Sequence, residues 1–235
     1  MWHTVRMSAA SIRARVRAEM TDEIKAVARR HLATDGANLS LRAVARDVGM
    51  VSSAVYRYFA SRDDLLTALI IDAYDALGAA AEVADPGGPF TGRYLAVGHA
   101  VRDWALANPH EWALIYGSPV PGYHAPADVT VGPGTRVVGA LLAVVAEGVA
   151  AGDVPDSGPS PSPSPSTSAD FAAVRQEFAF SGGDGPMMKG FLLWAALVGA
   201  VSLEAFGQYG VDTLSDPADV FDGQIRLLIA AATLN

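Results

Sequence analysis

One stretch of the sequence decides the fold: residues 41–59 read LRAVARDVGMVSSAVYRYF. Its apolar residues recur at steps of three and four, which predicts two short helices on either side of Gly49. Glycine permits the tight turn that such helices need where they meet. We expect the two helices to pack on each other through Val44, Ala45, Val48, Val55 and Phe59. The stretch is typical of a helix-turn-helix.

The second helix of this pair has an outer face suited to a DNA duplex. Its outward positions start with short side chains and continue with two tyrosines around an arginine: Ser52, Ser53, Ala54, Tyr56, Arg57 and Tyr58. Short side chains let a helix enter a major groove deeply, and hydroxyl and guanidinium groups suit phosphate oxygens. The sequence therefore favours double-stranded DNA as a partner.

The charge distribution supports this interpretation. The whole chain has a net charge of −8, which by itself argues against nucleic acid. Residues 1–62, however, hold 11 basic and five acidic side chains, a balance of +6, whereas the other 173 residues hold 6 basic and 20 acidic side chains, a balance of −14. A basic head on an acidic body indicates phosphate binding at one end. We expect a solvated basic face from Arg13, Arg15, Arg17, Arg29 and Arg30.

The remaining sequence predicts helices only, so the expected fold class is all-α. Apolar periodicity and capping residues place them at about 11–35, 61–83, 91–107, 109–116, 137–150, 171–178, 186–209 and 217–234, with Ser61 and Ser215 as caps. Residues 117–134 are rich in Pro and Gly and predict a loop. Residues 153–170 contain a Ser-Pro repeat that cannot bury much apolar area, which predicts disorder.

Three regions follow from these elements. Residues 1–10 lack helical periodicity and are expected to be a flexible arm. Residues 11–60 form the three-helix DNA-binding domain, and residues 61–235 form a larger helical domain for ligand binding and dimerisation, interrupted by the Ser/Pro-rich insert.

The N-terminal part resembles the tetracycline-repressor (TetR) family. The resemblance lies in residues 48–59, VGMVSSAVYRYF, followed by SRDDLL at 61–66. It implies that Ser52, Ser53, Ala54 and Arg57 face the groove, that Tyr56, Tyr58 and Arg62 hold the DNA backbone, and that Arg42 contacts a base or a phosphate. Ala54 stands where the family often has Thr, and Arg62 stands where it usually has Lys.

The C-terminal part resembles a TetR subtype named for a Trp-His-Gly (WHG) pattern. Trp194 and Gly199 match the pattern, whereas Val198 stands at the His position. The resemblance implies a ligand cavity in the C-terminal domain. The helix after residue 186 is apolar on all sides and rich in small residues, so we expect the last two helices of two chains to form a homodimer interface.

Aromatic residues are the candidates for the ligand pocket. The predicted lining consists of Trp104, His110, Trp112, Tyr116, Phe178, Met187, Phe191 and Trp194. Few charges and wide aromatic surfaces favour a small apolar or aromatic effector. The alternative for each residue is an ordinary core position.

Other classes of function fit the sequence less well. The chain has no cysteine, which excludes thiol chemistry and Cys-ligated metals. His110-Glu111 starts a metalloprotease-like pattern, but Leu114 replaces its second histidine. We expect no catalytic, metal or cofactor site, no membrane span and a cytoplasmic location. The sequence thus predicts a ligand-responsive transcriptional regulator, most readily a repressor, that binds a palindromic operator as a homodimer. The alternative is a DNA-binding dimer without a small-molecule effector, constitutive or controlled by a protein partner.

Overall fold

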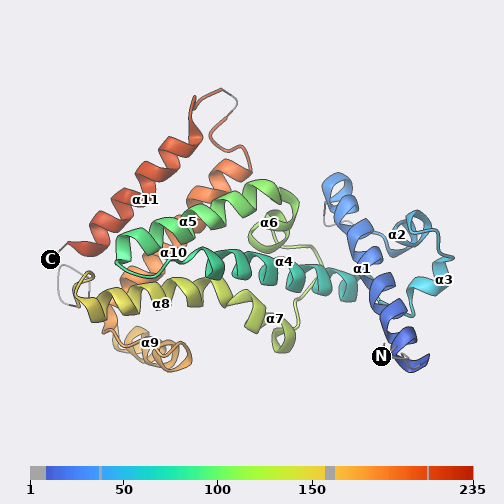
Figure 1. Ribbon diagram of the computed structural model, residues 1–235, viewed down its shortest axis with the longest axis horizontal. Coiled ribbons are helices and arrows are strands. Elements are labelled where there is room, and N and C mark those ends of the chain that lie inside the picture. The colour runs from blue at the N-terminus through green and yellow to red at the C-terminus, as the bar shows by residue number, and fades with distance from the viewer. Residues whose placement is uncertain (1–8, 37–38, 157–161, 211, 235) are drawn as a thin grey trace, which may run out of the picture.

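A computed structural model describes residues 9–36, 39–156, 162–210 and 212–234. Every regular element within these ranges is a helix, so the expected all-α fold is confirmed for the described chain. Figure 1 shows the N-terminal helices gathered at one end of the molecule, and the long helix α4 (Arg62–Ala84) leading from them into a larger helical body. Most of the predicted flexible arm, residues 1–8, lies outside the described residues.

The N-terminal domain consists of α1 (Ala9–Asp35), α2 (Leu41–Asp47) and α3 (Ser52–Val55). One face of α1 packs on α2 and α4, because its apolar residues Ile24, Val27, Ala28 and Leu32 repeat at helical spacing and are buried. They share a core with Leu39, Leu41, Val44, Ala45, Val55, Phe59, Leu65, Leu66 and Leu69. The start of α4 therefore belongs to the core of the N-terminal domain.

The C-terminal body is built around α4 (Arg62–Ala84) and α5 (Phe90–Ala107). The other helices are α6 (Pro109–Tyr116), α7 (Ala127–Gly134), α8 (Arg136–Ala151), α9 (Pro165–Glu177), α10 (Asp184–Ala205) and α11 (Pro217–Thr233). A second core forms where α4, α5, α8, α10 and α11 pack together, and its largest fully buried side chains include Trp112, Tyr94, Phe90 and Phe221.

Local signals explain several helix ends. The Ser61 hydroxyl accepts a hydrogen bond of 3.0 Å from the Asp64 amide, which confirms the predicted start of α4. Gly152 ends α8 with φ +84°, a left-handed conformation that glycine adopts without strain. The predicted cap of α11 was wrong by one residue: Asp216, not Ser215, accepts from the Asp219 amide.

Three predictions of local structure need correction. Residues 127–134, predicted as loop, form α7, because this segment packs on α4 and Thr130 is buried. Residues 165–170, predicted as disordered, form the first turns of α9, where Ser164 caps the Thr167 amide and Pro165 takes the first position. The recognition helix ends at Val55 rather than Phe59, although the Arg57 and Phe59 amides still bond to Ala54 and Val55 as turns.

Candidate nucleic-acid interface

The turn between α2 and α3 fixes the position of the recognition segment, which comprises α3 and the turns after it, residues 52–59. Gly49 has φ +80°, a conformation that L side chains rarely adopt. The Met50 amide then donates 2.8 Å to the Ala45 carbonyl, which closes the turn. Beneath it, the buried Val44 and Val55 join the two helices. The helix-turn-helix predicted from the sequence is therefore present, with its turn at Gly49.

The outer face of α3 and the turns after it carry the predicted DNA-binding residues. Ser52, Ser53 and Arg57 are exposed, and 47% of Tyr56 is accessible to solvent. Ala54 and Tyr58 are half-buried. None of the predicted set is sealed in the core, whereas Phe59, predicted as core, is buried. The face can therefore meet a duplex with short hydroxyl side chains in front and a tyrosine and an arginine behind them.

Two hollows flank this face and share one arginine. The first, about 470 Å³, is lined by Arg42, Tyr56 and Arg62, together with Leu39, Ser40, Leu41, Ala60 and Ser61. The second, about 770 Å³, lies along α2 and the turn and is lined by Arg42, Arg46 and Ser52, among others. Guanidinium and hydroxyl groups that surround a hollow suit phosphate oxygens. Three residues assigned to DNA by resemblance thus come together from three different elements.

Arg17 of α1 supports the recognition segment from behind. Its Nη2 atom donates 2.7 Å to the Arg57 carbonyl, and its guanidinium lies 5.2 Å from the centroid of the Tyr58 ring. The contact with the ring is a cation–π interaction. The sequence placed Arg17 in a general basic face, and no local signal distinguished it, because its partners are 40 residues away. Arg17 therefore orders the backbone next to Tyr56 and Arg57.

A histidine–aspartate contact connects α1 to α2. The Nε2 atom of His31 lies 2.8 Å from the Asp47 carboxylate. This hydrogen bond is the main cause that lowers the pKa of Asp47, and Arg46 contributes a smaller part. The pair fixes the end of α2 against α1, on the side where α2 turns into α3.

The N-terminal domain is joined to the C-terminal body by ion pairs of α1. Arg29 contacts Asp72 of α4 at 2.5 Å and Glu111 of α6 at 3.1 Å. Lys25 adds a contact of 2.9 Å to Asp72. Arg29, like Arg17, was expected on a solvated face, and the structure shows it half-buried at the domain junction. Side chains of the N-terminal domain therefore hold two helices of the other domain.

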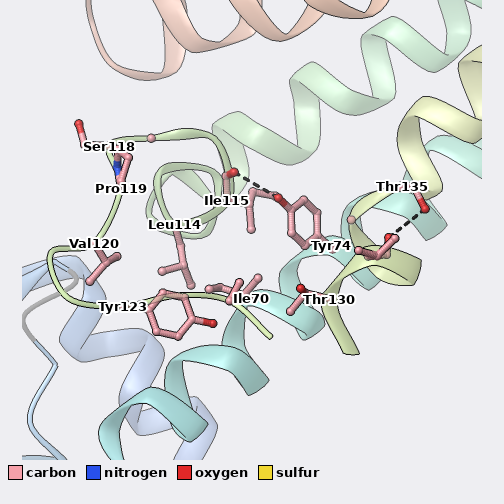
Figure 2. Close-up of a pocket in the computed structure, with 14 residues that line it drawn as sticks. Ile70, Tyr74, Leu114, Ile115, Ser118, Pro119, Val120, Tyr123, Thr130 and Thr135 are labelled. Atoms are coloured by element: carbon pink, nitrogen blue, oxygen red, sulfur yellow. Dashed lines mark hydrogen bonds between the residues drawn. The ribbon is translucent and has the colours of Figure 1, made fainter. Parts of the chain in front are cut away.

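A cavity of about 410 Å³ lies beside this junction (Figure 2). Its walls come from α4, α6, α7 and the connecting residues 117–126; they include Ile70, Tyr74, Leu114, Val120, Tyr123 and Thr130. The Tyr74 hydroxyl donates to the Ile115 carbonyl, and the Tyr123 hydroxyl lies 2.8 Å from that of Thr67. Burial raises the pKa of Tyr74, so its hydroxyl stays neutral.

The eight residues predicted to line a ligand pocket lie elsewhere. None of them is among the lining residues of this cavity. Trp112 and Met187 are fully buried in the C-terminal core, His110 is exposed, and the others are half-buried: Trp104, Tyr116, Phe178, Phe191 and Trp194. Tyr116 contacts the cavity wall indirectly, because its ring meets Tyr74 edge-on with centroids 6.2 Å apart. Burial, with a smaller effect of Tyr74, raises the pKa of Tyr116 to about 12.

No local pattern in the sequence indicates this cavity. Its walls bring together residues from 70 to 135, and many of them lie in the segment predicted as a loop.

For metal ligation, the described part of the chain holds no group of three or more His, Asp or Glu side chains that could bind an ion.

Two parts of the chain match known protein families. Residues 24–69 match the bacterial regulatory proteins of the tetR family, and residues 94–228 match the tetracyclin repressor-like C-terminal domain. The chain belongs to the TetR family. The first match covers the helix-turn-helix and the start of α4, and the second covers most of the body from α5 to α11.

Relatives of this TetR-family chain include helix-turn-helix (HTH) transcriptional regulators. It is 51% identical over 224 residues to the HTH-type transcriptional regulator Rv1816 of Mycobacterium tuberculosis H37Rv, and equally to Mb1846 of Mycobacterium bovis; 91% of this chain and 92% of each relative are covered. Among solved structures, the regulatory protein SCO4313 has a TM-score of 0.73 at 32% identity, covering 92% of this chain and 98% of the other. FadR of Bacillus subtilis, solved with stearoyl-CoA, has a TM-score of 0.64 at 11% identity, with 89% and 97% covered, and shows a shared fold alone.

One helix of this TetR-family chain resembles a membrane span in composition. Within the described residues, α10 alone is long and apolar enough by itself, and the bent pair α7–α8 passes only when taken together. Core helices of soluble proteins meet the same criterion, so a single such helix is weak support for a membrane protein. Leu193, Leu197 and Val201 of α10 are buried in the C-terminal core.

Proposed function

We propose that this chain is a ligand-responsive repressor of transcription, which binds a palindromic operator as a homodimer and leaves it when a small, largely apolar effector binds. The observation that carries the proposal is the surface around α3, where Arg42, Tyr56 and Arg62 surround one hollow next to the exposed Ser52 and Ser53. The surface belongs to the basic end of an otherwise acidic chain.

The predicted DNA-binding residues divide into two groups by their chemistry. Ser52, Ser53, Ala54 and Arg57 face the bases, where short side chains allow close approach and the guanidinium reads a guanine edge. Tyr56, Tyr58 and Arg62 hold phosphates, and Arg42, which lines both hollows, contacts a phosphate or a base between them. The first group determines which sequence is bound, and the second determines affinity for any sequence.

Dimerisation is proposed through α10 and α11. Leu192, Ala196, Gly199 and Leu203 follow one another at steps of three and four along α10, and Leu192 and Leu203 are exposed by 55% and 44%. Leu227 of α11 is 72% exposed and lines a groove with Ala196, Gly199, Ala200, Leu203, Gln224 and Leu228. Contiguous exposed apolar residues with small ones between them favour close packing against two equivalent helices of a second copy.

We also assign the C-terminal domain to the Trp-His-Gly subtype, with Val198 replacing the histidine. Trp194 packs against the core, whereas Gly199 lies in the groove between α10 and α11. A Cβ atom at Gly199 would meet nothing within 4 Å in the single chain. A glycine there would serve close contact with a partner helix rather than packing within the chain.

The effector acts by changing the separation of the two DNA-binding domains. It favours a dimer geometry that no longer fits both half-sites, and its effect is limited by its difference in affinity for the two geometries. In keeping with this role, we propose a cytoplasmic protein that catalyses no reaction. A DNA-binding dimer without an effector is the competing function.

Selection from a random pool of duplexes tests the DNA and dimer proposals together. We expect the selected duplexes to contain a palindrome whose half-sites lie roughly 34–36 Å apart. Sedimentation of the complex should show a dimer of the protein on each palindrome. Leu227→Glu should produce monomers and abolish binding to the full palindrome. Val83→Glu, at a residue 87% exposed on α4, is the matched control and should remain dimeric. Enrichment of no sequence by a folded wild-type protein would overturn the proposal.

A thermal-shift screen of apolar and aromatic compounds separates the two candidates. A ligand at about 100 times its dissociation constant stabilises a folded protein by about 2.7 kcal/mol, which such a screen detects easily. A compound that both stabilises the protein and releases the selected operator supports the ligand-responsive regulator. A protein that binds the operator but responds to no compound supports the competing function, a DNA-binding dimer without an effector.

A further inference from the structure

The first turns of α1 extend beyond the hydrophobic core of the N-terminal domain (Figure 1). Residues 11–19 are all exposed, and among the described side chains of α1 the first buried one is Ile24. The match to the tetR family also begins at residue 24, so these turns lie outside it. Packing in the core therefore does not explain why the helix continues this far.

One face of α1 changes from apolar to basic along its length. Ile24 and Ala28 are buried on this face, and toward the N-terminus they are followed by Arg17 and Arg13, at steps of seven and four residues. Residues at these spacings share one face of an α-helix. A helix face that packs on protein is apolar, so two arginines in its continuation indicate a partner with negative charge.

The contacts of Arg17 place this face beside the recognition segment. Its guanidinium donates to the Arg57 carbonyl at 2.7 Å and lies over the ring of Tyr58. Arg13 is one helical turn further toward the N-terminus, about 6 Å along the axis, and its side chain is exposed. The surface of α1 around Arg13 is therefore continuous with the proposed DNA interface.

The opposite face of α1 supplies a contrast. Arg15 is two residues from Arg13, which corresponds to about 200° around the helix axis. Its Nε atom pairs with the Glu19 carboxylate at 3.4 Å, so its charge is partly balanced within the helix. Of these two arginines, only Arg13 lies on the face that Arg17 holds against the recognition segment.

We propose that Arg13 is a further DNA-contacting residue, which binds a phosphate of the duplex backbone that the recognition segment does not reach. The inference rests on the proposed function, because it requires that the chain binds DNA. A phosphate contact carries no sequence information of its own. Arg13 therefore adds affinity for any sequence and lengthens the stretch of backbone that each protomer holds.

Phosphate ethylation interference with the full chain and a duplex selected from the random pool tests the contact. An ethyl group removes the negative charge of one phosphate and weakens binding wherever the protein needs that charge. We expect the wild type to depend on at least one phosphate that has no influence on Arg13→Ala. Arg15→Ala removes the same charge from the opposite face and should keep the wild-type pattern. Identical patterns for the wild type and Arg13→Ala would overturn the inference.

Salt titrations on a duplex with a single half-site give a second readout. Arg13→Ala should bind about three- to tenfold more weakly at about 0.1 M salt, with a slope of log K against log salt shallower by about 1. Arg13→Lys should keep the wild-type slope, and Arg15→Ala should stay close to the wild type. Equal losses in Arg13→Ala and Arg15→Ala would show a general effect of charge and overturn the contact. A wild type that binds no duplex would overturn the proposed function, and the inference with it.

Discussion

The Nε atom of Arg29 in α1 lies 3.1 Å from the Oε1 atom of Glu111 in α6. The same guanidinium contacts Asp72 in α4 at 2.5 Å, so one side chain of the DNA-binding domain holds two helices of the C-terminal domain. The contact with α6 is partly exposed to solvent, which weakens it by screening. We therefore expect the contact to affect the relative orientation of the domains more than their stability.

Glu111→Gln should loosen this orientation. We expect affinity for the full palindrome to fall about two- to fivefold, which corresponds to the weak energy of a partly exposed pair, while affinity for an isolated half-site stays unchanged. Fluorescence anisotropy with the two duplexes measures the difference. Glu82→Gln, at the far end of α4 where Glu82 pairs with Arg136, is the control. Equal losses on both duplexes would contradict the orientation role.

Arg62→Ala and Tyr56→Phe should weaken binding to all sequences alike, because both residues are assigned to phosphates. For Arg62→Ala the slope of log K against log salt should become shallower by about 1, since one phosphate contact is lost. Titrations at several salt concentrations measure this, with Arg175→Ala on α9 as the control. An unchanged affinity and slope for Arg62→Ala would show that the phosphate assignment is wrong.

Ser53→Ala should change which sequence is preferred rather than the general affinity for DNA. Ser53 is exposed in the first turn of α3, where a recognition helix contacts base edges. Repeating the duplex selection with the variant should relax one base position in each half-site, at a cost of about 1–3 kcal/mol for that discrimination. An identical selected sequence would remove Ser53 from the reading face.

Trp112→Ala should lower the free energy of unfolding by about 3–5 kcal/mol, because the side chain is fully buried and leaves a large cavity. Its Nε1 atom donates 3.2 Å to the Ser202 hydroxyl, so Ser202→Ala should cost about 1–3 kcal/mol by leaving the indole N–H without that partner. Denaturant unfolding measures both. If Ser202→Ala were neutral, the link between α6 and α10 would rest on packing alone.

Asp85→Asn should make stability less dependent on pH. The hydrogen bond from Arg93 is the main cause that lowers the pKa of Asp85. Such a carboxylate contributes stability above its unfolded pKa, about 3.9, and the contribution is lost as the pH falls through the lower folded value. We expect the variant to be less stable by about 1–3 kcal/mol at pH 7. The difference from the wild type should shrink below about pH 4.

Unfolding curves at pH 7, 5 and 3 test this prediction. Asp170→Asn, at an exposed carboxylate of α9, is the control and should leave the stability at pH 7 unchanged. A difference between Asp85→Asn and the wild type that stays constant down to pH 3 would exclude the Arg93–Asp85 contact as its source.

Local signals were sufficient for the DNA-binding domain. The turn at Gly49 and the cap at Ser61 depend on residues within a few positions of each other, so they can be recognised in the sequence. The orientation of α3 by Arg17 could not be predicted, because it depends on the Arg57 carbonyl 40 residues away. The assignment of individual residues to bases and phosphates stays a prediction.

Neither the cavity nor α7 could be predicted from local sequence signals, because both depend on packing between residues far apart in the sequence. The run Gly132-Pro133-Gly134 has poor helix propensity and indicates a loop, yet packing on α4 makes 127–134 helical. The composition of the Ser-Pro run predicts disorder, although Ser164 followed by Pro165 is also a helix start. For the aromatic residues, residue type alone does not separate a core position from a cavity wall.

The helix α4 begins inside one hydrophobic core and ends inside the other. Its 23 residues span about 34 Å at 1.5 Å per residue. Because one continuous helix is part of both cores, the two domains cannot change their relative orientation independently of α4. A tilt of about 5° in that helix, about a pivot near Ala84, would carry Arg62 about 3 Å sideways. In the proposed homodimer the same displacement would occur in both protomers, and it could move the two DNA-binding domains out of register with their half-sites.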